Sequence, residues 1–161
     1  LDNGTLACKG DRVPAASHVA QIARTCTVHD DGSVRCWGYN SKGELGDGST
    51  AERHAPAKVK GLAGARDLAL GAHHSCALLQ DGGVLCWGQN DKGQLGDGGK
   101  ADRSAPAPVP GLSGAVSLMA SGDRSCARLG SGDIVCWGDN QKGELGDGSR
   151  EPRSAPTAVR W

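Results

Sequence analysis

The sequence predicts an all-β fold built from a tandem repeat, and three observations support this prediction. Cysteines recur at Cys26, Cys76 and Cys126, at a fixed spacing of 50 residues. Glycine supplies 26 of the 161 residues, whereas methionine occurs once and phenylalanine is absent. That composition disfavours a helical bundle and favours short strands joined by tight turns. Each period also contains two strand-like runs separated by a turn, which indicates a β module as the repeated unit.

The period extends well beyond these cysteines. A second cysteine, a Trp-Gly pair, a Gly-x-Leu-Gly-Asp-Gly segment, an arginine and an Ala-Pro pair all recur at the same spacing. Their first residues, unit by unit, are Cys36, Cys86 and Cys136; Trp37, Trp87 and Trp137; Gly43, Gly93 and Gly143; Arg53, Arg103 and Arg153; Ala55, Ala105 and Ala155.

Within a period, residues 75–79 and 84–88 read as the two strands of a β-hairpin. If Cys76 lies directly opposite Cys86, the loop has three residues, and Gly82 occupies the third position, where a left-handed backbone is usual.

Two further runs complete the period. Residues 67–70 precede the hairpin, and residues 56–59 offer an edge strand, because proline is tolerated at an edge. About four strands per period is the pattern of one propeller blade. We therefore expect a single partial-propeller domain over residues 1–161, with a split blade strand at 1–10, a short first unit at 11–38, complete units at 39–88 and 89–138, and the start of another unit at 139–161.

A longer motif resembles the regulator of chromosome condensation repeat: Cys-Trp-Gly-x-Asn-x-x-Gly-x-Leu-Gly-Asp-Gly, then Arg-x-x-Pro-x-x-Val-x-Gly-Leu, then Ser-Cys-Ala. Here these residues are Cys86-Trp87-Gly88, Asn90, Gly93, Leu95-Gly96-Asp97-Gly98, Arg103, Pro106, Val109, Gly111-Leu112 and Ser125-Cys126-Ala127. The resemblance runs from about Cys26 to Val159. It implies a seven-bladed β-propeller in which each repeat is spread over adjacent blades. This chain would supply about three blades of four-stranded antiparallel sheet, plus split ends, in the manner of a bacterial, cysteine-paired, secreted member.

The paired cysteines predict three disulfides, because residues ten apart across a three-residue hairpin loop face each other on one side of the sheet. The pairs are Cys26 with Cys36, Cys76 with Cys86, and Cys126 with Cys136. Free buried thiols and a zinc site are the alternatives, although the spacing of metal ligands is absent. Cys8 has no partner in this pattern and is expected to be unpaired or paired externally. Disulfides predict a secreted, periplasmic or cell-surface protein.

Other residues recur in every unit, and we assign them structural roles for that reason. The tryptophans Trp37, Trp87 and Trp137 and the leucines Leu45, Leu95 and Leu145 are expected to pack between blades. An exposed stack of the tryptophans is the alternative. The glycine-rich loop that contains each leucine invites a calcium interpretation, but its oxygen donors lack the alternating spacing and a lysine intrudes, so we expect a structural turn.

The adjacent pair His73 and His74 corresponds to Asp123 and Arg124 one period later. These residues lie on the loop that enters the hairpin, and they are the candidate contact loop. A plain solvated loop is the alternative. We expect no catalytic residue, no cofactor and no metal site, because no nucleophile, base or phosphate-binding pattern breaks the symmetry of the repeat.

Charge excludes other classes of function. Eighteen basic residues balance eighteen acidic ones, so no strong field favours nucleic acid, and the apolar runs are too short to span a membrane.

We expect a protein-binding or scaffold module without catalysis, whose partner is another protein or further copies or segments that complete the propeller. The alternatives are an enzyme, a lyase or hydrolase with a site in the central channel, and the exchange factor for a small GTPase that the family's namesake implies. The cysteine pairs and the lack of a basic arm disfavour the exchange factor.

Overall fold

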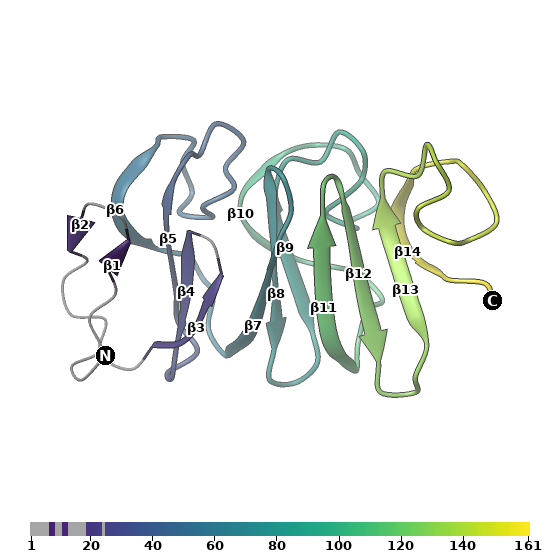
Figure 1. The fold of residues 1–161 in the computed structure, drawn as a ribbon, viewed down its shortest axis with the longest axis horizontal. Helices are drawn as coiled ribbons and strands as arrows, with labels where there is room; N and C mark the ends of the chain where they lie inside the picture. Colours follow the sequence, from purple (N-terminus) through teal and green to yellow (C-terminus); the bar gives the residue numbers. More distant parts are fainter. Residues whose placement is uncertain (1–6, 9–10, 13–18, 24) are drawn as a thin grey trace.

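The computed structural model describes residues 7, 8, 11, 12, 19–23 and 25–161, and it describes the side chains of 19–21 and 25–161. The regular elements of this part of the chain are fourteen β-strands (Figure 1). The all-β prediction is confirmed. Among the described residues, no helix has the length and hydrophobicity required to cross a membrane.

Twelve of the strands form three four-stranded antiparallel sheets, which lie side by side along the long axis of the molecule (Figure 1). We call them the first, second and third blade. The first contains β3 (Val19–Ala23), β4 (Cys26–His29), β5 (Val34–Gly38) and β6 (Arg53–Lys58). The second contains β7 (Ala65–Leu70), β8 (His74–Leu79), β9 (Val84–Gly88) and β10 (Arg103–Pro108). The third contains β11 (Ala115–Ser121), β12 (Arg124–Leu129), β13 (Ile134–Gly138) and β14 (Arg153–Ala158). A two-stranded sheet of β1 (Ala7–Cys8) and β2 (Asp11–Arg12) precedes them.

The central hairpin of each blade has the register that the sequence predicts. Cys76 on β8 lies opposite Cys86 on β9. Backbone hydrogen bonds from Leu79 N to Gly83 O and from Gly82 N to Leu79 O, of 2.9 and 3.1 Å, close the loop. Gly82 adopts a φ of 84°, a conformation that glycine tolerates at low cost.

The proline-containing strands β6, β10 and β14 are the outer edges of their sheets, as expected. Each of them pairs with the second strand of the hairpin that precedes it in the chain. A unit counted from 39 to 88 therefore contains the outer strand of the first blade and three strands of the second, so each repeat is spread over two blades. The C-terminal end differs from the expected split blade, because β14 is the fourth strand of the third sheet.

The hydrophobic core lies between the blades, because side chains alternate between the two faces of each strand. In the second blade, Cys76 and Leu78 belong to a cluster shared with the third blade, whereas Ala77 and Trp87 belong to a cluster shared with the first. We call the side that faces the preceding blade the front face and the other side the back face. The contact between the first and second blades is the first seam, and the contact between the second and third is the second seam.

Candidate functional site

The glycine-rich loop of each unit is a closed hydrogen-bond network. In the third unit, Asn140 is buried; its Oδ1 accepts from Leu145 N at 2.9 Å, and its Nδ2 donates to Asp147 Oδ1 at 3.2 Å. Arg153 Nε donates to Asp147 Oδ2 at 2.6 Å. Hydrogen bonds from Ser149, followed by those from Arg153, hold the pKa of Asp147 far below its ordinary range. Both carboxylate oxygens are thus already engaged by donors of the chain.

The same network recurs in the other two units. Asp47 pairs with Arg53 and Asp97 pairs with Arg103, at 2.6 and 2.7 Å. A carboxylate that is saturated by internal donors and neutralised by a guanidinium is poorly suited to bind calcium, so the geometry supports the structural interpretation of these loops. Among the described residues, no three His, Cys, Asp or Glu side chains lie close enough together to share a metal ion.

The loops 39–52 and 89–102 also supply the acceptor that joins two blades. In the first seam, Glu44 O accepts from Trp87 Nε1 at 2.8 Å and from Ser75 Oγ at 2.9 Å. Leu45, next to Glu44, is 2% exposed and belongs to the cluster that also contains Trp87. An indole and a leucine from neighbouring units therefore pack between the blades, whereas Trp37, on the front face of the first blade, is partly exposed.

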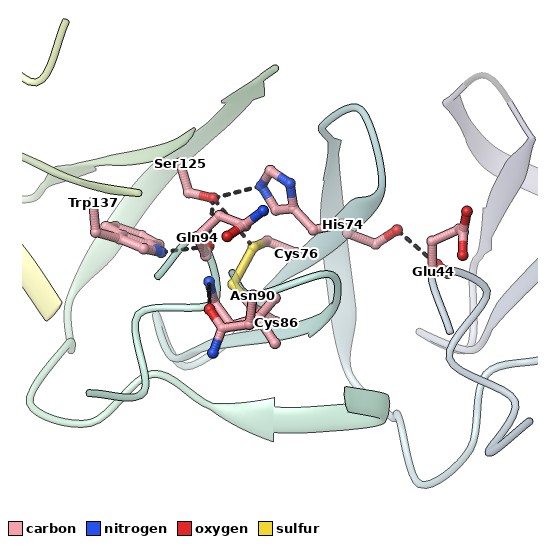
Figure 2. The surroundings of a disulfide bond; sticks show 10 residues. Glu44, His74, Cys76, Cys86, Asn90, Gln94, Ser125 and Trp137 are labelled. Carbon is pink, nitrogen blue, oxygen red and sulfur yellow. Dashed lines mark hydrogen bonds between the residues drawn. A yellow bond between two sulfur atoms is a disulfide. The ribbon is translucent and has the colours of Figure 1, made fainter. Parts of the chain in front are cut away.

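The second seam repeats this arrangement with one addition, the ring of His74 (Figure 2). Trp137 Nε1 and Ser125 Oγ donate to Gln94 O at 2.9 and 3.1 Å. His74 Nε2 lies 2.8 Å from Ser125 Oγ. Because the serine hydrogen is directed to Gln94 O, His74 Nε2 carries the hydrogen and donates it to Ser125. The carboxamide of Gln94 is itself fully buried.

His74 therefore differs from the expected contact residue, because its ring is buried in the second seam. It is 1% exposed, and its Nδ1 has no hydrogen-bond partner among the described residues. Burial, with a smaller contribution from the neighbouring His73, lowers the pKa of His74 to about 4. The ring is consequently neutral at neutral pH.

The contact between His74 and Ser125 is a serine–histidine pair, but its geometry serves structure rather than nucleophilic catalysis. Ser125 is 1% exposed and donates to Gln94 O, and no third group in the described part of the chain orients the imidazole through its Nδ1.

The rest of the expected contact loop does reach the surface. The side chain of His73 is 50% exposed, and its Nδ1 lies 3.5 Å from Glu44 Oε1. Asp123 and Arg124 are partly exposed, and Arg124 Nη1 lies 3.7 Å from Glu144 Oε1. We call this side of the molecule, formed by the loops 39–52, 89–102 and 139–152 and by the turns that precede β8 and β12, the loop-side face. In Figure 1 it lies at the end of the blades opposite the hairpin turns.

Tyr39, which is not among the residues predicted from the sequence, is 70% exposed on the loop-side face. The signal was present in the repeat itself, because the positions equivalent to Tyr39 carry Gln89 and Asp139. A position that changes from an aromatic to an amide and a carboxylate is not required by the fold.

The three cysteine pairs are joined by disulfides in the structure. Their Cα atoms lie 4.2, 4.1 and 4.1 Å apart for the pairs that begin at Cys26, Cys76 and Cys126. The disulfides of the first and second blades are buried in the first and second seams. In the third blade Cys136 is buried and Cys126 is partly exposed. The prediction for Cys8 falls on a side chain outside the described part of the structure.

The described residues line cavities beside the seams, of which we consider two. One, of about 220 Å³, is lined in part by Glu44, Ser75 and His74, although the ring of His74 points away from Glu44 and towards Ser125 (Figure 2). The other, of about 370 Å³, lies where the inner strands meet. There Gln21 Nε2 donates to Asp67 Oδ1 at 2.8 Å and Arg66 Nη2 donates to Ala115 O at 3.1 Å. These two hydrogen bonds connect β3 to β7 and β7 to β11, which are the first strands of successive blades.

Comparison with known families identifies the repeat. The model of the regulator of chromosome condensation (RCC1) repeat matches residues 31–78 and 81–129, and a second model of the same repeat matches 65–94 and 116–144. The chain belongs to the RCC1 repeat family. Together the two models of the RCC1 repeat match residues 31–144, which are more than half of the sequence and include the central hairpins of the second and third blades.

Solved structures similar to this RCC1-repeat chain are propellers that are longer than it. Human WBSCR16 matches with a TM-score of 0.81 at 23% identity, over 94% of this chain and 42% of that one. Prp20p from Saccharomyces cerevisiae matches with a TM-score of 0.80 at 24% identity, over 94% of this chain and 40% of that one. Yeast RCC1 (Prp20) bound to Kap60 matches with a TM-score of 0.79 at 21% identity, over 98% of this chain and 42% of that one.

At these identities the similarity concerns the fold, and the chain spans about two fifths of the length of these proteins. It is consistent with a partial propeller. A search of curated protein sequences finds no match.

Proposed function

We propose that this chain is part of a protein-binding or scaffold module without catalysis, and that its loop-side face carries the contact surface. The supporting observation is a contrast within each repeat. Polar residues that recur, such as Asn140 and Asp147, make their hydrogen bonds within the fold. Residues that differ between repeats, such as Tyr39 and His73, are exposed together on one side.

A scaffold that fixes its loops rigidly and varies their exposed positions is the usual design of a recognition surface. Proteins with the same fold bind other proteins: the structure of Prp20p is described with its binding properties to Gsp1p and histones, and yeast RCC1 is bound to Kap60. The partner of this chain is a protein on this proposal, since its balanced charge gives nucleic acid no electrostatic attraction.

The three disulfides support a location in an oxidising compartment, as a secreted, periplasmic or cell-surface protein. There a propeller segment with a largely small-residue core gains stability from cross-links that each close one hairpin.

The test is affinity capture with the immobilised chain from the secreted and envelope fractions of its source organism. The variant Tyr39→Ser/His73→Ser/Asp123→Ser alters the loop-side face, and Asp31→Ser/Lys58→Ser/Asp133→Ser alters exposed residues near the opposite hairpin turns. We expect a stoichiometric protein that binds the wild type and the second variant but not the first. Equal capture by all three, or substrate turnover without a partner, would contradict the proposal.

A further inference from the structure

Among the histidines whose side chains the structure describes, His74 alone is buried, and it lies in the second seam. Among the described residues, the one hydrogen bond of its ring connects the second blade to Ser125 of the third, and Ser125 continues the chain of bonds to Gln94 O. The charge state of this ring therefore bears directly on a contact between two blades.

The surroundings of His74 favour the neutral form of its ring. A protonated imidazole carries a hydrogen on both nitrogens, but Nδ1 of His74 is buried and no described residue offers it an acceptor. The ring packs so closely on the backbone of Gly71 that a Cβ there would collide with it. Protonation in the closed seam would bury both a charge and an unsatisfied N–H, which is costly.

The charged groups of the surrounding elements do not offset that cost. On its own element, His73 adds a like charge when it is protonated. From the third blade, the neighbour of Ser125 is the cation Arg124, which is paired with Glu144. Asp123 precedes Arg124, and Asp91 in the loop of Gln94 accepts from the Gln94 amide at 3.4 Å. Among the described residues, none of these carboxylates accepts from His74 Nδ1.

We propose that His74 makes the second seam acid-sensitive, so that protonation of its ring loosens the contact between the second and third blades while the first seam stays closed. The first seam is joined by Ser75 and Trp87 on Glu44 O, and no buried histidine is described there.

The sign of the pH effect follows from the pKa of His74 in the closed and in the open seam. The closed seam lowers the pKa of His74 to about 4, whereas an exposed ring titrates near 6.5. Above about 6.5 both states are neutral and pH has no effect. As the pH falls from about 6.5 towards 4, the ratio of open to closed seam rises up to about tenfold per pH unit.

The indole hydrogens report on each seam separately, because Trp137 Nε1 donates in the second seam and Trp87 Nε1 in the first. Hydrogen exchange of the four indoles is followed by NMR and corrected for the intrinsic effect of pH. Between about pH 6.5 and 5, exchange at Trp137 is expected to rise about 15-fold, with Trp87 unchanged. An equal rise at both indoles, or no rise at Trp137, would overturn the proposal.

His74→Gln retains an amide donor for Ser125 but does not titrate, so it should abolish the response of Trp137. His54→Gln, at an exposed position of β6, is the matched control and should preserve it. Persistence of the response in His74→Gln would overturn the assignment to this ring. If that variant does not fold, the ring resonances of His74 in the wild type decide, since titration near the ordinary pKa in the folded protein is incompatible with the mechanism.

Discussion

Leu95→Ala is expected to destabilise the protein by roughly 2 to 4 kcal/mol, because it removes a side chain from the centre of the second seam. Leu95 is 1% exposed and packs in one cluster with Val84 and Val109 of the second blade and with Leu118 and Trp137 of the third. The loss combines the transfer free energy of the deleted methyl groups with the cavity that the two blades leave around them.

Asp91→Ala, four residues earlier in the same loop, is the matched comparison. Asp91 is exposed, and its carboxylate only accepts from Gln89 and Gln94, at 2.8 and 3.4 Å, so its removal should cost a few tenths of a kcal/mol. Urea denaturation followed by circular dichroism gives both free energies, and thermal unfolding should show a fall in melting temperature of roughly 4 to 16 °C for Leu95→Ala. Equal losses in the two variants would show that the core does not lie in the seams.

Three other predictions rest on single contacts. Mass spectrometry without reduction should find disulfides between residues ten apart in all three hairpins, and complete alkylation of these cysteines under oxidising conditions would refute the pairing. Gly96→Ala should lower the urea midpoint far more than Gly98→Ala. Both glycines have a positive φ, but only at Gly96 would a Cβ lie 2.8 Å from Trp137 Nε1. Equal shifts in the two variants would show that this close contact does not limit the residue at position 96. Burial raises the pKa of Asp97, but hydrogen bonds from Gly99, Arg103 and Asn90 lower it more. The carboxylate therefore contributes stability at pH values above the ordinary pKa of 3.8, and this contribution is lost as the pH falls through the lowered pKa of the folded state. Arg103→Gln should therefore flatten the loss of stability in acid, and an unchanged pH profile would contradict this role.

The repeat made most of the fold predictable. Hairpin register could be derived because two cysteines, a three-residue loop and a third-position glycine impose the same pairing. The spread of each repeat over two blades came instead from the family resemblance. Local pattern does not specify which sheet the proline strand joins, because β6 pairs with β5 by a contact across the 14-residue loop 39–52.

The candidate site was predicted less well, because exposure depends on which face of a strand a residue occupies. His73 and His74 are adjacent in sequence, yet one is exposed and the other buried. β8 begins at His74, so this side chain shares the back face with Cys76 and Leu78, and the alternation that gave the disulfide could also have predicted its burial. Nothing in the sequence specified the hydrogen bond to Ser125, which comes from a different blade.

Repeat symmetry also distinguishes the two seams from the back face of the third blade, and this leads to a last prediction. Val28 and Leu78 are each 1% exposed in their seams, but the equivalent residue of the third blade, Arg128, is exposed, as is Met119 where the second blade has the buried Ala69. Leu78→Arg would force a guanidinium into the cluster shared with the third blade and should cost more than about 4 kcal/mol. Arg128→Leu restores the residue type of the seams on a face that no described residue covers, and should change the free energy of unfolding by less than about 0.5 kcal/mol. Urea denaturation of both variants measures the contrast. A large loss in Arg128→Leu would mean that its guanidinium is part of the folded core, and a small loss in Leu78→Arg would mean that the second seam is not packed as the structure shows.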